Sequence, residues 1–305
     1  MTRAVVFAYH NVGARCLRVL LAHGVDVALV VTHGDDPREN LWFERVAEVA
    51  ASYGLAIATP DDPNDAAFVA RIAALAPEFI FSFYYRRMLA PPLLSLPRRG
   101  ALNMHGSLLP KYRGRAPVNW AVLNGERQTG ASLHYMVAKP DAGDLVAQTA
   151  VPILPDDTAR EVFDKVTVAA EVTLDGVLPA LLNGIAPRVA LDLAQGSYFG
   201  GRSAEDGRID WSQAARRIHD LVRAVAPPYP GALTTIGDRP ARILATRVLD
   251  ANAPPRPAAL EVVAGRIIAH CGGGGTLWLR NVEIDGAAAT AGALMGAPIP
   301  LAASR

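Results

Sequence analysis

Residues 101–144 read ALNMHGSLLPKYRGRAPVNWAVLNGERQTGASLHYMVAKPDAGD and begin with a short apolar strand that ends in NMHG. Because successive side chains of a strand point to opposite faces, Asn103 and His105 share one face and Met104 lies on the other. The glycine after His105 ends the strand and begins a loop. The pattern therefore predicts an amide and an imidazole side by side at a strand end.

Two later segments of the same stretch add charge. The loop after the strand carries Lys111, Arg113 and Arg115, and Asp141 lies in a PDAG turn after another strand. Taken alone, the first is typical of a solvated loop and the second of an ordinary turn. Beside a strand end, the basic loop favours a cradle for phosphate or carboxylate. If Asn103, His105 and Asp141 converge, they would form an acid/base site with an oxyanion donor.

Apolar runs alternate with helical patterns on the N-terminal side of this stretch. We expect strands at residues 4–9, 25–31, 55–58 and 79–84, with helices between them. This alternation is typical of an α/β fold with a Rossmann-like, doubly wound, mostly parallel sheet. Ligands bind such sheets beyond the carboxyl ends of the strands, where Asn103 and His105 lie.

The pattern changes in the C-terminal third. After expected strands at 128–137 and 145–153 and a long helix ending at 182, short strands alternate with turns rich in Pro, Gly and Ala. These strands are expected at 232–236, 241–249, 258–269 and 276–284, which is the rhythm of a small β-barrel. We therefore expect a catalytic domain at 1–200 and a smaller β domain with its connecting helix at 201–305.

The bulk composition limits the possible partners and cofactors. The 305 residues include 30 basic and 29 acidic side chains, so the balance predicts no nucleic-acid partner. No apolar window is long enough for a membrane span or a signal sequence, and the two cysteines form no CxxC pair, which predicts a soluble cytoplasmic protein. No side chains have metal-ligand spacing and no GxGxxG motif is present, so we expect neither a metal nor an NAD site. His10 and His134 are expected to be structural.

With these residues in view, the chain resembles the folate-dependent formyltransferases. The resemblance rests on Asn103-x-His105, the SLLP loop at 107–110 and Asp141-x-Gly143, and it extends over essentially the whole chain. It implies a Rossmann-like catalytic domain followed by a C-terminal β-barrel resembling an OB fold. It also implies 10-formyltetrahydrofolate as the co-substrate.

The resemblance assigns roles to the matching positions. Asn103 would hydrogen-bond the oxyanion at the formyl carbon, His105 would be the general acid/base, and Asp141 would hold His105. The expected folate-binding residues are Arg87, Met88, Leu89, Arg115, Val137, Ala138, Lys139, Pro140 and Asp141.

The segments FSFYYR (81–86), HGSLLPKYRGRAP (105–117) and RAVAPPYPGA (223–232) look most like the subfamily that formylates the 4-amine of UDP-4-amino-4-deoxy-L-arabinose. That resemblance implies a place in lipid A and lipopolysaccharide modification and in resistance to polymyxin. It also implies UDP-sugar and formyl folate as small-molecule partners, no membrane partner, and a separate decarboxylating dehydrogenase acting upstream.

Other functions stay open at this point. They are methionyl-tRNA formyltransferase, which the near-neutral charge disfavours, another nucleotide-amino-sugar N-formyltransferase, a formyltetrahydrofolate hydrolase, and a non-catalytic binder. The sequence does not fix the amino sugar, the oligomeric state, the residues that contact the nucleotide, or whether the chain is half of a bifunctional enzyme.

Overall fold

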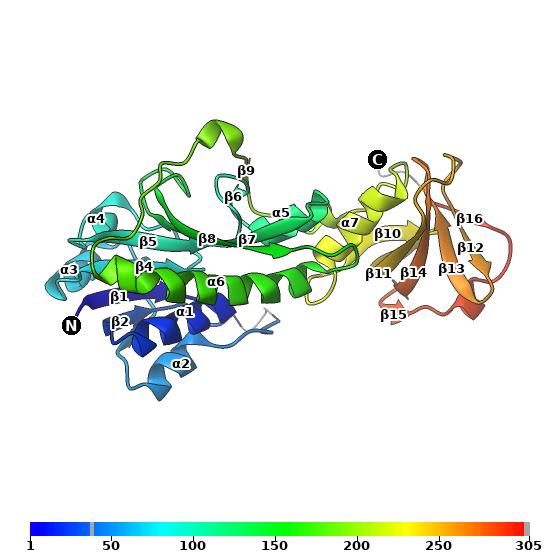
Figure 1. Ribbon diagram of the computed structural model, residues 1–305. Helices are drawn as coiled ribbons and strands as arrows, with labels where there is room; N and C mark the ends of the chain where they lie inside the picture. The colour runs from blue at the N-terminus through cyan, green and yellow to red at the C-terminus, as the bar shows by residue number, and fades with distance from the viewer. Residues whose placement is uncertain (37–39, 302–305) are drawn as a thin grey trace. The chain divides into compact units, whose positions relative to one another are not determined.

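A computed structural model describes residues 1–36 and 40–301 of the chain (Figure 1). It contains two compact units. The first comprises Met1–Pro117, Gln128–Val151 and Asp164–Phe199, and the second comprises Val118–Arg127, Pro152–Phe163 and the residues from Gly200 onward. Each unit is assembled from three separate segments of the chain, so the expected domain division at residue 200 stays a prediction.

A seven-stranded sheet forms the centre of the first unit, in the order β3-β2-β1-β4-β5-β7-β8. The strands are β1 (Arg3–Ala8), β2 (Asp26–Val31), β3 (Ile57–Ala58), β4 (Phe79–Phe83), β5 (Gly100–His105), β7 (Gln128–Tyr135) and β8 (Leu145–Pro152). Strands β1 to β5 are parallel to one another, and β7 pairs with β5 antiparallel. The predicted α/β class and mostly parallel sheet are confirmed.

The buried strands are continuous apolar runs, as expected where helices cover both faces of a sheet. The helices of this unit are α1 (His10–Ala22), α2 (Val46–Ser52), α3 (Ala66–Ala74), α4 (Pro91–Leu94) and most of α6 (Ala159–Leu182). Arg15 of α1 pairs with Glu171 of α6, so these helices lie side by side (Figure 1). Side chains of β1, β2 and β4 pack against Ile72 of α3 and Leu93 of α4.

The sheet order determines where the carboxyl end of β5 lies. The chain runs from β1 outward to β3, then crosses to β4 and β5 on the other side of β1. A ligand crevice is expected beyond the carboxyl ends of strands near such a reversal. The carboxyl end of β5, which carries Asn103 and His105, lies between β4 and β7.

The second unit is built on a curled antiparallel sheet, as the sequence predicts. Its strands are β10 (Ala232–Ile236), β11 (Arg239–Asp250), β12 (Ala259–Val263), β13 (Arg266–His270), β14 (Thr276–Ile284), β15 (Ala287–Ala288) and β16 (Ile299–Pro300). Its helices are α5 (Pro117–Leu123) and α7 (Ala215–Val225), with short 3-10 turns at Glu205–Gly207 and Ala291–Leu294. Trp211 is fully buried among apolar side chains of α7 and the sheet.

One expected strand is wrong. Residues 258–269 do not form a single strand, because β12 and β13 make a hairpin with Ala264 and Gly265 at its tip. Both tip residues have positive φ, 47° and 72°. That backbone suits a two-residue hairpin turn, for which Ala-Gly is a weaker signal than Asn-Gly.

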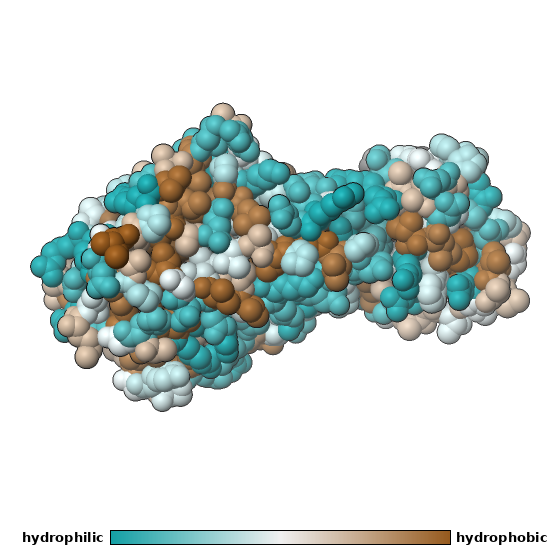
Figure 2. Space-filling view, viewed as in Figure 1, coloured by the Kyte–Doolittle hydropathy of each residue, from teal (hydrophilic) through white to brown (hydrophobic). Residues whose placement is uncertain are grey.

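The surface is mixed in polarity. On the face shown in Figure 2, apolar side chains form separate patches among hydrophilic ones. Within the described residues, no helix has both the length and the apolar character required to cross a membrane.

Candidate functional site

The candidate site begins with cross-strand pairing on β5. Asn103 lies opposite His134 of β7, and His105 lies opposite Ser132. Directly opposed residues of an antiparallel pair project from the same face of a sheet. The alternation predicted for Asn103 and His105 therefore extends across to a second pair of polar side chains on β7.

His105 is held between a backbone carbonyl and a carboxylate. Its side chain is buried, with Nε2 at 2.8 Å from the Tyr112 carbonyl oxygen and Nδ1 at 3.6 Å from Asp141 Oδ1. A carbonyl oxygen only accepts, so Nε2 carries a hydrogen. Nδ1 is therefore the nitrogen that can give or take a proton.

Asp141 joins the predicted pair from the turn after β7. Its Oδ2 accepts a hydrogen bond from the Gly114 N–H at 2.9 Å, and its Oδ1 lies 3.4 Å from Asn103 Nδ2. Burial alone would raise the pKa of Asp141, but the charge of His105 and the hydrogen bond from the Gly114 N–H lower it below its ordinary value. The carboxylate is therefore ionised at neutral pH.

His134 is a fourth member that the sequence interpretation missed. Its Nδ1 lies 2.8 Å from the Tyr135 carbonyl, and its Nε2 lies 3.2 Å from Asn103 Nδ2 and 3.4 Å from Asp141 Oδ1. With Nδ1 donating to a carbonyl, Nε2 of the neutral ring accepts from the Asn103 amide. The signal was present in the sequence, because Ser132-x-His134 has the same spacing as Asn103-x-His105 on an adjacent strand.

The loop after β5 is fixed by a buried hydroxyl. Ser132 Oγ donates to the Ser107 carbonyl at 2.5 Å and accepts from the Leu109 N–H at 3.1 Å, while Gln148 Nε2 donates to the Leu109 carbonyl at 2.8 Å. A Cβ at residue 106 would lie 1.8 Å from the Tyr84 hydroxyl, so any residue larger than glycine would require the Tyr84 side chain to move. The loop that holds the Tyr112 carbonyl against His105 is therefore closely constrained.

A short strand pair continues this loop. β6 (Arg113–Gly114) pairs in parallel with β9 (Tyr198–Phe199), just after the 3-10 turn Leu193–Gln195. The Tyr112 N–H donates to Ser197 Oγ at 2.9 Å, and the Tyr112 ring stacks on Phe199 with centroids 5.2 Å apart. Tyr112 has a φ of 57°, a conformation that costs energy in a bulky residue and is often found at functional sites.

The residues expected to bind folate fall into three groups. Arg87 and Met88 are exposed after β4, whereas Leu89 is buried in the core. Asn64 holds their loop, donating to the Met88 carbonyl at 3.0 Å and accepting from the Ala90 N–H at 2.7 Å. The other groups are Arg115, which is exposed, and the loop after β7 with Val137, Ala138, Lys139, Pro140 and Asp141. The structure brings Asp141 from this set into contact with Asn103 and His105.

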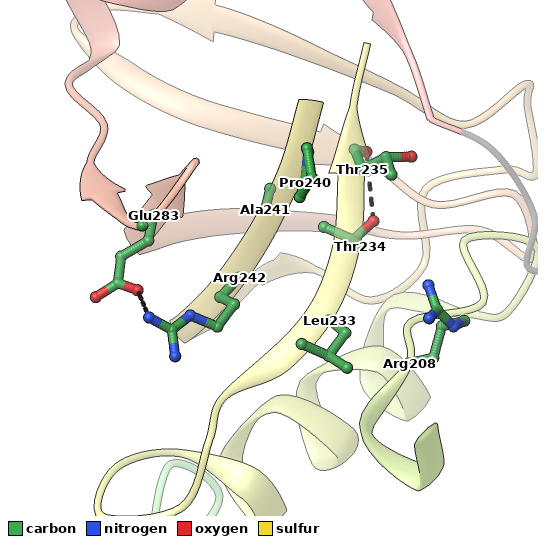
Figure 3. A pocket seen from close by; sticks show the side chains of 9 residues that line it. Arg208, Leu233, Thr234, Thr235, Pro240, Ala241, Arg242 and Glu283 are labelled. Carbon is green, nitrogen blue, oxygen red and sulfur yellow. Dashed lines mark hydrogen bonds and ion pairs between the residues drawn. The ribbon is translucent and has the colours of Figure 1, made fainter. Parts of the chain in front are cut away.

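A groove of about 500 Å³ is lined by residues of β10 and β11 together with Arg208, Glu283 and Gly286 (Figure 3), and its lining belongs entirely to the second unit. In the part of the chain that the structure describes, no three His, Cys, Asp or Glu side chains are grouped to hold a metal ion.

Comparisons with known proteins identify both parts of the chain. The family model described as formyl transferase matches residues 5–178, and the model described as formyl transferase, C-terminal domain, matches residues 202–296.

Solved structures share the fold at low identity. An N-formyltransferase from Helicobacter canadensis, in complex with folinic acid and dTDP-3-aminofucose, is 18% identical, with a TM-score of 0.72 over 92% of this chain and 99% of that one. WlaRD, a sugar 3N-formyl transferase in the presence of dTDP and 5-N-formyl-THF, is 17% identical, with a TM-score of 0.72 over 93% and 98%. A 4-N formyltransferase from Francisella tularensis is 19% identical, with a TM-score of 0.62 over 76% and 91%.

Proposed function

The chain belongs to the formyltransferase family, and on that premise we propose that it transfers a formyl group from 10-formyltetrahydrofolate to the amine of a nucleotide-linked sugar. The observation that carries the proposal is the convergence of an amide, an imidazole and an ionised carboxylate at the carboxyl end of β5. These are the groups that acyl transfer to an amine requires.

In the proposed reaction the neutral amine attacks the formyl carbon. A new C–N bond forms, the bond from the formyl carbon to N10 of the folate breaks, and the amine proton ends on N10. Asn103 Nδ2 donates to the oxyanion, replacing its long 3.4 Å contact with Asp141. His105 carries the proton through Nδ1, because Tyr112 occupies Nε2. Asp141 holds the ring and stabilises its protonated form.

The chemistry of the expected folate residues fits the co-substrate. Met88 and Val137 are large apolar side chains that are 58% and 45% exposed, as suits a flat aromatic ligand. Arg87 and Arg115 are exposed cations that could pair with the carboxylates of its glutamate tail. These residues would hold the folate, and His105 and Asn103 would act on its formyl group.

We propose UDP-4-amino-4-deoxy-L-arabinose as the acceptor, formylated on its 4-amine for lipid A modification and polymyxin resistance. Support comes from the motif resemblance at 81–86, 105–117 and 223–232. The nucleotide sugars and formyl folates named for the structural neighbours support the wider class. The near-neutral net charge of +1 disfavours tRNA as the acceptor.

The test supplies 10-formyltetrahydrofolate with three acceptors in parallel, UDP-4-amino-4-deoxy-L-arabinose, dTDP-3-aminofucose and charged initiator tRNA, and includes a fourth reaction without an acceptor. Mass spectrometry should detect the formylated UDP-sugar, with little formate released when the acceptor is omitted. A formylated product from the tRNA alone would instead indicate a methionyl-tRNA formyltransferase. Formate release alone would indicate a formyltetrahydrofolate hydrolase. In the same assay Asn103→Ala should lower kcat by about 10²- to 10³-fold, with melting temperature as the folding control.

A further inference from the structure

Arg113 lies between the two backbone groups that hold the acid/base pair. The carbonyl of the preceding residue, Tyr112, accepts from His105 Nε2 at 2.8 Å, and the N–H of the following residue, Gly114, donates to Asp141 Oδ2 at 2.9 Å. The Arg113 N–H itself donates to the Ser197 carbonyl at 3.0 Å. Its backbone is therefore fixed beside the reacting groups.

The side chain of Arg113 is a buried cation without a counter-charge. It is 8% exposed, and its Nε is buried without a hydrogen-bond partner in the described part of the chain. Within residues 1–36 and 40–301, no carboxylate lies at ion-pair distance from its guanidinium. The second arginine that is buried to this extent among these residues, Arg223, pairs with Asp220 at 2.8 Å and donates to the Asp157 carbonyl at 3.1 Å.

This difference indicates a ligand. An uncompensated buried charge is costly, so proteins pair such groups or neutralise them with a bound ion. Guanidinium donors match phosphate oxygens in pairs, and arginine is the usual residue for that contact. The unsatisfied donor capacity of Arg113 is therefore suited to an anion that arrives with a substrate.

We propose that Arg113 binds the diphosphate of the nucleotide-sugar acceptor. This assignment rests on the proposed function. One sugar ring separates the reacting amine from the phosphate, whereas an aromatic ring and an amide separate N10 of the folate from its carboxylates. An arginine whose backbone neighbours contact His105 and Asp141 is therefore better placed for the diphosphate. Arg115 and Lys111, which flank it in the loop, are exposed.

The test measures binding without catalysis. Isothermal titration with UDP and with dTDP, and separately with 5-formyltetrahydrofolate, is carried out on the wild type, Arg113→Gln, Arg113→Lys and, as a matched control, Arg98→Gln, which changes an exposed arginine just before β5. Arg113→Gln should weaken binding of the nucleoside diphosphate by at least about tenfold and leave binding of 5-formyltetrahydrofolate unchanged. Arg113→Lys should lie between the two, and Arg98→Gln should match the wild type.

Three results would overturn the assignment. Loss of folate affinity in Arg113→Gln would mean that Arg113 serves the folate carboxylates. Unchanged affinity for both ligands in Arg113→Gln would mean that Arg113 has no role in binding. Failure of the wild-type protein to bind either UDP or dTDP would show that the site does not take a nucleoside diphosphate. Failure of the proposed function is a separate result, since it appears in the wild type as absence of any formylated nucleotide sugar.

Discussion

The Asn103 amide can stabilise an oxyanion only if its nitrogen faces the formyl oxygen. Two acceptors fix that orientation, His134 Nε2 at 3.2 Å and Asp141 Oδ1 at 3.4 Å. Amide nitrogen and oxygen are otherwise interchangeable by a simple rotation. We therefore propose that His134 acts through Asn103 as a positioning residue.

We predict that His134→Leu, which removes the acceptor, lowers kcat about tenfold or more while the KM values for both substrates stay near those of the wild type. His134→Gln, which retains an acceptor oxygen, should recover part of the loss. Steady-state kinetics on the two variants distinguish this role from a purely structural one. The idea is wrong if both variants lose stability equally and keep the kcat of the wild type.

Asp141, which holds His105 in the proposed reaction, also affects stability through its lowered pKa. A carboxyl whose folded pKa lies below its ordinary value of 3.8 stabilises the fold above that pH. This stabilisation is lost as the pH falls below about 3.8 towards the folded pKa, because the unfolded chain then binds more protons.

Asp141→Asn, which keeps the shape and removes the charge, should reduce kcat by about 10²- to 10⁴-fold. It should also lower the stability most at neutral pH, with the difference from the wild type narrowing below about pH 3.8. Urea unfolding at a series of pH values checks the second part. A stability difference that stays constant down to acid pH would show that the Asp141 charge does not support the fold.

At the scale of elements, local sequence patterns were sufficient to predict the geometry of residues that lie on the same strand. Alternation on β5 placed Asn103 and His105 on one face. It could not reveal that Asp141 contacts them, because that contact depends on antiparallel pairing of β7 and on the return of the next loop. For the same reason His134 was interpreted as structural: its partner is 31 residues away in the chain.

The loop at 87–90 depends on an element that is distant in sequence. Asn64, just before α3, holds this loop by its hydrogen bonds to Met88 and Ala90. We predict that Asn64→Ala raises the KM for 10-formyltetrahydrofolate about 5- to 10-fold with little change in kcat. The substitution removes two hydrogen bonds from the loop at 87–90, which is proposed to bind the folate, and leaves Asn103, His105 and Asp141 in place. Asp61→Ala, an exposed change nearby, is the control. An unchanged folate KM in Asn64→Ala would argue against a role for residues 87–89 in folate binding.

At the scale of the whole molecule, the sequence predicted both sheets but not how the chain contributes to them. The second unit takes in residues 118–127 and 152–163 through contacts that no local pattern encodes. Asn119 Nδ2 donates to the Ala224 carbonyl at 2.9 Å, and Arg223 donates to the Asp157 carbonyl at 3.1 Å. Such long-range pairing is visible only in three dimensions.

The second unit also contains a buried histidine with a shifted pKa. His219 Nε2 lies 3.0 Å from the Pro155 carbonyl and Nδ1 lies 2.8 Å from Thr246 Oγ1, which fits a neutral ring with its hydrogen on Nε2. Burial lowers the pKa of His219 most. The charge of Arg223 lowers it further, and the Pro155 carbonyl, Asp220 and Asp156 oppose the shift only in part.

Stability should therefore fall as the pH drops below 6.5, the ordinary value for His219. In that range His219 binds a proton more readily in the unfolded chain than in the folded second unit. Protonation therefore lowers the free energy of unfolding. Above pH 6.5 both states are neutral at this position and the contribution is constant. Tryptophan emission, to which the fully buried Trp211 in the core of this unit contributes, should report the urea midpoint between about pH 5 and pH 8. His219→Gln should be less stable at pH 8 because it loses buried hydrogen bonds, yet its midpoint should depend less on pH below 6.5. A pH profile of His219→Gln parallel to that of the wild type would show that another group controls this transition.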